Sequence, residues 1–184
     1  MRNGSAAQLS SSLEIRAIRF EEVADTLALI RRAVERGCRE HYDATERAAV
    51  FVSYAHNLFV EALGPFDTIA AFDRDPERDP ERDRDRPALI GFAQLDPADA
   101  RLRALFVEGD LQQRGVGSAL LAEIERRALQ RGLARLHGAM SLNAVPFYLR
   151  AGFRPRPGPE RLVAAGVPVP VLRMEKDLRA VTRS

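Results

Sequence analysis

Apolar and polar residues alternate near the start of the chain and then change their period. Residues 13–19 (LEIRAIR) mostly alternate between the two kinds, which is typical of a strand that buries one face. From Val23 to Val34 the apolar residues recur at helical spacing. A second helix is expected to begin near Asp43, because Asp-Ala-Thr-Glu has the form of a capping box, and to continue through Tyr54. The chain therefore opens with one strand and two helices.

Three further strand candidates surround a highly charged segment. The candidates are residues 67–72 (DTIAAF), 88–95 (ALIGFAQL) and 101–107 (RLRALFV). Residues 73–87 repeat the motif DPER, contain three prolines and carry nearly balanced charge. Such a segment cannot bury apolar surface. We predict that residues 73–87 form an enlarged hairpin loop between two antiparallel strands.

The second half of the chain begins with an amphipathic helix. Its apolar face starts near Gly117, and Gly132 is a suitable stop. The segments that follow are a strand at 133–141, a short helix within 143–153, and strand candidates at 161–163 and 169–174. This order predicts an α/β (α+β) fold around one mixed sheet, with antiparallel hairpins and one βαβ crossover.

Length and composition favour one globular domain. The chain has 184 residues, 46% of them apolar and 29% charged. We place the domain at residues 13–178, with a disordered tail at 1–12 and a C-terminal tail at 179–184. Its formal charge is +2, and basic and acidic residues are interleaved. This pattern shows no basic stripe for nucleic acid, so no nucleic-acid partner is expected.

The single cysteine, Cys38, excludes an internal disulfide and a cysteine-based metal cluster. No metal is therefore expected. The first twelve residues resemble neither a signal peptide nor a membrane anchor, and apolar runs of membrane-spanning length are missing from the sequence. We expect no membrane partner and a cytoplasmic location.

The junction between residues 101–107 and the helix that follows has features of an anion site. The first turn of a helix has amide groups without intrahelical partners, and its dipole favours negative charge. Gly115 and Gly117 lack the side chains that would keep a diphosphate away from the backbone. The same glycines also suit a tight turn with no ligand, and both interpretations stay open. A Walker loop does not fit, because Gly-Lys-Ser/Thr is absent. A Rossmann fingerprint does not fit either, because Leu120 stands where the third small residue is needed.

Two motifs together resemble the GNAT N-acetyltransferase superfamily. Gln112, Gly115 and Gly117 match its acyl-CoA signature Gln/Arg-x-x-Gly-x-Gly/Ala. Residues 143–148 (NAVPFY), followed by 151–153 (AGF), are similar to its Asn-x-x-x-x-Phe-Tyr-x-x-x-Gly-Phe segment. The resemblance implies a mostly antiparallel, twisted sheet of about seven strands, flanked by about four helices.

The resemblance also implies a site for acetyl-CoA. The strand end would pair through its main chain with the pantetheine arm, and amides of the glycine turn would hold the pyrophosphate. The implied cofactor-binding residues are Leu105, Phe106, Val107, Gln112, Gln113, Arg114, Gly115, Val116, Gly117, Ser118, Asn143 and Phe147.

Some of these residues have a second interpretation. Arg114 is as well suited to face solvent as to face the pyrophosphate. Asn143 is suited to contact the pantetheine and also to cap a helix. Phe147 is most simply a packing residue, and Arg150 is a solvated helix position or a phosphate contact.

The implied reaction is direct acyl transfer to an amine. Tyr148 stands at the family's position for the acid that protonates the departing thiolate. A backbone N–H of the strand that carries Phe106 and Val107 is the expected donor to the oxyanion. The resemblance leads us to expect an N-acetyltransferase that uses acetyl-CoA, with an amine-bearing small molecule or protein as acceptor. A noncatalytic acyl-CoA-binding sensor or regulatory module is the alternative, and longer acyl groups and a homodimer are also compatible with the sequence.

The general base is not apparent from the sequence. Many family members place a Glu on the strand before the glycine turn, but here residues 101–104 read Arg-Leu-Arg-Ala. The remaining candidates are His41, Tyr42, His137 and water. Cys38 is expected to be a small buried residue and not a nucleophile.

Overall fold

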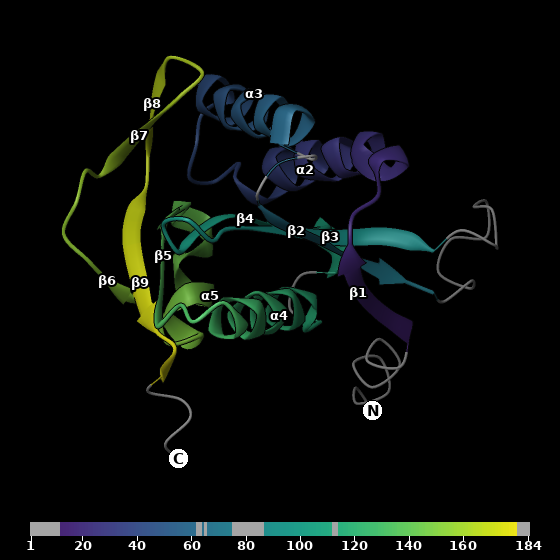
Figure 1. Ribbon diagram of the computed structural model, residues 1–184. Coiled ribbons are helices and arrows are strands. Elements are labelled where there is room, and N and C mark those ends of the chain that lie inside the picture. The colour runs from purple at the N-terminus through teal and green to yellow at the C-terminus, as the bar shows by residue number, and fades with distance from the viewer. Residues whose placement is uncertain (1–11, 62–63, 65, 75–86, 112–113, 180–184) are drawn as a thin grey trace, which may run out of the picture.

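The computed structural model of the protein describes residues 12–61, 64, 66–74, 87–111 and 114–179 (Figure 1). Most of the predicted tails at 1–12 and 179–184, and most of the predicted loop at 73–87, lie outside the described residues. Gln112 and Gln113 also lie outside them.

A seven-stranded sheet forms the centre of the fold. Its strand order is β1-β2-β3-β4-β5-β9-β6, and all neighbours are antiparallel except β4 and β5. The helix α4 connects β4 to β5, which is the predicted βαβ crossover. The strands are β1 (Leu13–Ala17), β2 (Asp67–Asp73), β3 (Ala88–Asp96), β4 (Arg101–Val107), β5 (Arg135–Met140), β6 (Arg154–Pro155) and β9 (Leu172–Asp177).

Helices cover both faces of the sheet. The helices α2 (Val23–Gly37) and α3 (Ala44–Glu61) lie on one face, and α4 (Val116–Gln130) and α5 (Val145–Arg150) lie on the other (Figure 1). Three short 3₁₀ turns, η1 (Phe20–Glu22), η2 (Gly109–Leu111) and η3 (Leu142–Ala144), connect these elements. In the described part of the chain, the helices are too short or too polar to cross a membrane.

Each helical layer encloses its own apolar core. Leu120 and Ile124 of α4 are fully buried against the sheet together with Leu136 of β5. On the opposite face, Leu29 and Ile30 of α2 are fully buried in a second cluster. The period-2 and helical patterns of the sequence therefore correspond to a three-layer arrangement, and the predicted fold class is confirmed.

A separate hairpin departs from the expectation of a single sheet. Strands β7 (Arg161–Ala164) and β8 (Val167–Pro170) pair only with each other and lie against α3 (Figure 1). Their turn places both Ala165 and Gly166 at positive φ, the conformation of tight hairpin turns. The predicted strand at 169–174 is therefore divided between β8 and β9.

An ion pair fixes the corner between β1 and η1. Both terminal guanidinium nitrogens of Arg16 donate to the carboxylate of Glu22, at 2.6 and 2.8 Å, and the backbone N–H of Arg19 donates to the same group at 2.8 Å. Glu22 is buried. These hydrogen bonds lower the pKa of the Glu22 carboxyl, with the Arg16 bond as the largest cause.

Replacing Glu22 by Gln should lower the free energy of unfolding at neutral pH by about 1–3 kcal/mol, because an amide cannot replace the charge-assisted bonds. The folded pKa of Glu22 lies below its ordinary value of 4.5. Its contribution is therefore complete above that value and is lost as the pH falls through the folded pKa. Urea unfolding of both proteins across this range measures the effect. A difference in unfolding free energy between the two proteins that stays constant down to about pH 2 would contradict this pH dependence.

Candidate functional site

Strands β4 and β5 separate soon after they meet. Although they are neighbours in the sheet, they pair at one position only, Arg101 with His137, near the start of each strand. Beyond that position the edge of β4 that faces β5 has no strand partner among the described residues. An unpaired strand edge offers main-chain N–H and C=O groups to a ligand.

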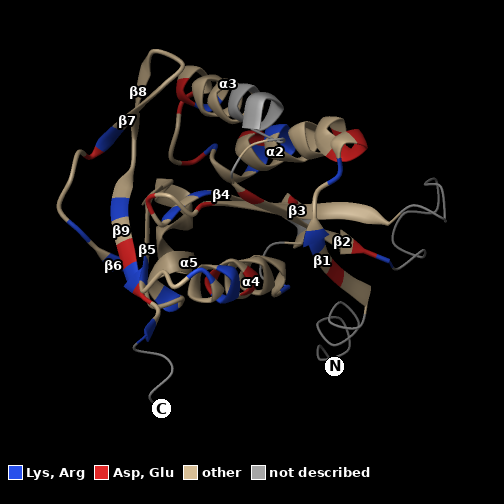
Figure 2. Cartoon of the chain, in the orientation of Figure 1, with Lys and Arg blue, Asp and Glu red and all other residues tan. Residues whose placement is uncertain are grey.

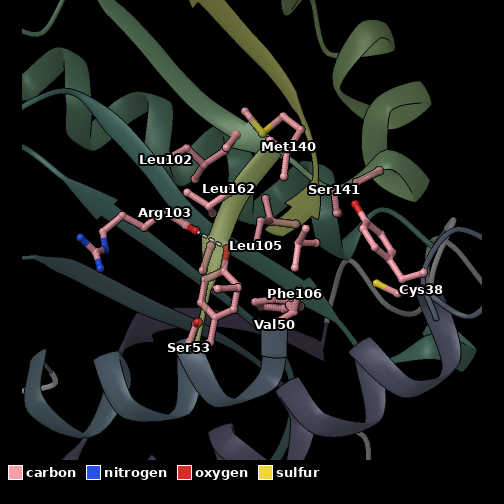
Figure 3. Close-up of a pocket in the computed structure, with 18 of the residues that line it drawn as sticks. Cys38, Val50, Ser53, Leu102, Arg103, Leu105, Phe106, Met140, Ser141 and Leu162 are labelled. Carbon is pink, nitrogen blue, oxygen red and sulfur yellow. Dashed lines mark hydrogen bonds between the residues drawn. The ribbon is translucent and has the colours of Figure 1, made fainter. Parts of the chain in front are cut away.

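A cavity of about 270 Å³ occupies the region where the strands diverge. It is lined from both layers of the molecule: Tyr148 comes from α5, whereas Ser53 and Tyr54 come from α3 on the opposite face. The hairpin closes a further side with Leu162, Val163 and Ala164. Figure 3 shows Leu162 among the lining residues together with Leu105 and Phe106 of β4, and Cys38 and Ser141 at another side.

The glycine turn leads into α4 as the sequence predicts. Gly115 is the N-cap of this helix and has φ of +89°, a conformation that residues with a side chain rarely adopt. Its carbonyl accepts the first helical hydrogen bond, from Ala119 N–H at 2.9 Å. Val116 is buried, whereas Gly115 and Ser118 are exposed. The first turn of α4 thus begins beside exposed residues, and its first amides have no partner within the helix.

Gly117 lies close to the other motif. A β-carbon at this position would be 3.6 Å from the ring of Phe147 and 3.6 Å from a methyl of Val107, which is ordinary van der Waals contact. The half-buried Phe147 therefore bridges the two motifs by packing. Arg114 is exposed, as is Arg150.

The turn before the glycines is fixed to α2. The carboxylate of Glu108 accepts hydrogen bonds from Arg32 at 2.9 Å and lies 4.0 Å from Arg36. Leu111, which ends η2, is buried in the core under α4. These contacts hold the turn between β4 and α4 from both sides.

Tyr148 is buried at the cavity. Its ring packs edge-on against Phe147 and Phe153, at 5.0 and 5.3 Å between centroids. Burial raises the pKa of its hydroxyl above the ordinary value, so the phenol is protonated at neutral pH. Among the described residues the structure provides no hydrogen-bond partner for this hydroxyl. The proton of Tyr148 is therefore available to a ligand.

A β-bulge in β4 shapes the cavity wall. Gln94 pairs with Ala104 and Leu95 pairs with Leu102, so Arg103 is an extra residue on β4. Its carbonyl accepts a hydrogen bond from the Tyr54 hydroxyl at 2.8 Å (Figure 3). Sequence reasoning placed Tyr54 on a helix but missed this contact, because neither a bulge nor its partner has a local signal.

Tyr42 joins three segments around the cavity. Its hydroxyl donates to the carbonyl of Pro170 at 2.8 Å and accepts from the N–H of Leu142 at 2.8 Å. Burial raises the pKa of Tyr42 to about 12. A hydroxyl that is engaged in this way on both sides is poorly suited to act as a base.

Cys38 lines the cavity and contacts Asn143, which is not itself among the lining residues. The Cys38 thiol lies 3.5 Å from the side-chain oxygen of Asn143, to which it donates. Burial raises the pKa of this thiol to about 11, which agrees with a small buried residue and not a nucleophile. Ser141 and Ala144 occupy the N-cap positions of η3 and α5. Asn143 is therefore not a helix cap, which removes that interpretation.

Neither histidine candidate is among the described residues that line the cavity. His41 is exposed and is not among the lining residues. His137 sits where β4 and β5 pair, and its Nε2 contacts the carbonyl of Asp99 at 2.8 Å. The described lining residues include no Asp, Glu or His.

Comparison with known proteins agrees with this geometry. A family model described as an acetyltransferase (GNAT) domain matches residues 83–178, just over half of the chain. The chain belongs to the GNAT acetyltransferase family. The match covers β4, α4, β5 and α5, which carry both sequence motifs. No curated protein matches the sequence.

Solved structures of the same fold are numerous. A GCN5-related N-acetyltransferase from Rhodopseudomonas palustris is 24% identical, with a TM-score of 0.74, and the alignment covers 90% of this chain and 96% of that one. The PaiA N-acetyltransferase from Thermoplasma acidophilum, solved in complex with coenzyme A, is 18% identical, with a TM-score of 0.70 and coverage of 90% and 99%. A GCN5-related N-acetyltransferase from Kribbella flavida is 21% identical, with a TM-score of 0.61 and coverage of 91% and 99%. These likenesses establish the fold of this GNAT protein.

Tyr42→Phe should lower the free energy of unfolding by about 1–3 kcal/mol, because the N–H of Leu142 and the carbonyl of Pro170 both lose a buried partner. Tyr148→Phe is the matched control, since its hydroxyl has no hydrogen-bond partner among the described residues. Urea unfolding of the two variants measures the difference. Equal losses of stability would mean that the Tyr42 hydroxyl does not fasten the cavity wall.

Proposed function

We propose that this GNAT protein is an N-acetyltransferase that moves an acetyl group from acetyl-CoA directly to an amine. The cavity between the diverging strands β4 and β5 is the observation that carries the proposal. It connects an unpaired strand edge, a buried protonated tyrosine and a space enclosed by the opposite layer. A donor can enter such a site from the α4 face, and an acceptor from the α3 face.

The donor is held by two main-chain elements. The edge of β4 from Leu105 to Val107 pairs with the amide groups of the pantetheine arm, as an added strand would. The pyrophosphate binds at the first turn of α4, where free amides and the helix dipole favour an anion. This placement is supported by Gly115 at positive φ and by the exposure of the turn. The complex of the Thermoplasma acidophilum relative with coenzyme A supports the choice of donor.

Tyr148 acts as the acid for the departing thiolate. A thiol has a pKa of about 8.5, so the thiolate of CoA is basic enough to need a proton or a strong hydrogen bond as it leaves. The Tyr148 phenol is protonated at neutral pH, and since burial raises its pKa further above that of a thiol, proton transfer needs the departing sulfur within hydrogen-bond reach of its O–H. Without a competing partner among the described residues, its O–H is free to donate to the sulfur.

Water is the base that we favour for the amine. An alkyl ammonium group with a pKa of about 10.4 loses its proton at neutral pH at a cost of roughly 4 kcal/mol. The described lining residues provide no carboxylate or imidazole for this step. Burial holds the pKa of Cys38 at about 11 and that of Tyr42 at about 12. Neither group is ionised at neutral pH, so the proton passes to solvent through the cavity.

Gly117→Glu should weaken acetyl-CoA binding by about 100-fold or more, because it adds a negative charge beside the proposed pyrophosphate site. A β-carbon fits at this position, so the fold should persist. Ala122→Glu, an exposed site on the next turns of α4, makes a comparable charge change away from the helix start. Calorimetric titration of both variants measures affinity. Unchanged binding by Gly117→Glu would exclude the helix start as the phosphate site.

Tyr148→Phe should lower kcat by about 100-fold while changing acetyl-CoA affinity little, because it removes only the donated proton. Thiol release against a panel of amines, together with calorimetric titration of acetyl-CoA, separates the two effects. A normal rate would remove Tyr148 as the acid. Acetyl-CoA binding without thiol release for any amine in the panel would favour the noncatalytic sensor.

A further inference from the structure

The charged residues that line the cavity are all basic. In the part of the chain that the structure describes, Arg101, Arg103 and Arg173 are the lining residues with a charged side chain. Much of the remaining wall is apolar, as in the hairpin segment Leu162–Ala164, with hydroxyl groups from Ser53 and Tyr54. An amine acceptor that carries several positive charges would find no counter-charge here.

Two of these arginines are already engaged. Arg101 lies 3.5 Å from Asp96 and 3.4 Å from Asp99. Arg103 donates to the side chain of Gln94 at 3.3 Å and lies 3.8 Å from Asp96. In Figure 3 the guanidinium of Arg103 points away from the cavity centre, while its carbonyl faces inward. The carboxylates of Asp96 and Asp99 offset the charge of these two side chains, although the buried Nε of Arg101 has no hydrogen-bond partner among the described residues.

Arg173 differs because it has no acidic partner among the described residues. Its one side-chain hydrogen bond is donated by Nε to the carbonyl of Pro159, at 3.3 Å. Its stem packs over Gly158, where a β-carbon would be 3.0 Å from the Arg173 Cγ. The stem is therefore held in place while the terminal nitrogens keep their donor capacity.

The strand register directs Arg173 toward the acceptor side. Met174, the next residue of β9, is fully buried in the core under α4. Successive residues of a strand point to opposite faces, so Arg173 points to the face of the sheet that carries α3 and the hairpin. Arg173 pairs with Ala139 of β5, which also lines the cavity.

Nearby acidic groups do not neutralise this position. Glu175 is two residues after Arg173 on β9. Its carboxylate lies 4.0 Å from Arg135 and 3.9 Å from Arg156, so its ion pairs are with those residues. Glu160 is exposed and is not among the lining residues. Figure 2 shows basic and acidic segments alternating along β9, with arginines also on β6 and β7.

We propose that the acceptor is a small amine that also carries an anionic group, a carboxylate or a phosphate, and that this group pairs with Arg173. The proposal rests on the proposed function. A planar guanidinium binds either oxyanion through two parallel hydrogen bonds. The pairing holds the amine end of the acceptor toward β4 and Tyr148, and the lack of an acidic side chain among the described lining residues disfavours polyamines and aminoglycosides.

Thiol-release kinetics with matched amines test the proposal. The probes are free α-amino acids against their amides, O-phosphoethanolamine against ethanolamine, and spermidine. The anionic member of at least one pair should have kcat/KM about ten-fold or more above its neutral partner, and spermidine should be the poorest substrate. The two pairs also show whether a carboxylate or a phosphate is preferred.

Arg173→Gln should raise KM for the anionic acceptor about ten-fold or more, with little change in kcat and in acetyl-CoA affinity. Arg173→Lys should raise KM less than Arg173→Gln does, because it keeps the positive charge but not the two parallel donors of the guanidinium. Arg154→Gln is the control, since this residue of β6 is exposed and outside the lining; it should leave KM unchanged.

Three outcomes would overturn the proposal. They are a preference for spermidine or for the neutral partners, an equal effect of Arg173→Gln on charged and neutral acceptors, and no turnover of any anionic amine while other amines are acetylated. Failure of the unmodified protein to bind acetyl-CoA, or binding without turnover of any amine, would instead contradict the proposed function, so the two failures are distinguishable.

Discussion

The site depends on the single pairing between β4 and β5. Parallel neighbours in a sheet normally continue their hydrogen bonds along the strands, but here the ladder stops at Arg101 and His137. The crossover helix α4 connects the two strands, which remain neighbours in the sheet. Their divergence therefore leaves an unpaired edge and a cavity inside an otherwise well-packed sheet. The hairpin and α3 enclose that opening, and α5 brings Tyr148 to it.

Three buried tyrosine hydroxyls line this opening, and all of them are neutral. Burial raises the pKa of Tyr42, Tyr54 and Tyr148, so none of these phenols is ionised near neutral pH. Tyr42 and Tyr54 use their hydroxyls to hold main-chain groups, whereas the hydroxyl of Tyr148 has no such use among the described residues. Three residues of one type thus have different roles because their surroundings differ.

Local patterns predicted the elements better than the walls of the site. The helical spacing after Val23 and the strand candidate at residues 88–95 correspond to α2 and β3. In a regular strand Ala104 would share a face with Leu102. The bulge at Arg103 reverses this: Leu105 packs in the same core as Leu102, and Ala104 packs in the core on the opposite face. A bulge is decided by the partner strand, so one strand's sequence does not reveal it.

The sequence by itself determined the fold class, the two motifs and the family they indicate, because periodicity, glycine positions and short-range spacing are local properties. It also correctly showed that β4 carries no carboxylate. Only the tertiary structure decided which distant groups meet. It left His41 and His137 out of the cavity lining and brought Arg173 into it. These outcomes depend on strand register and on packing between layers, which link residues more than a hundred positions apart.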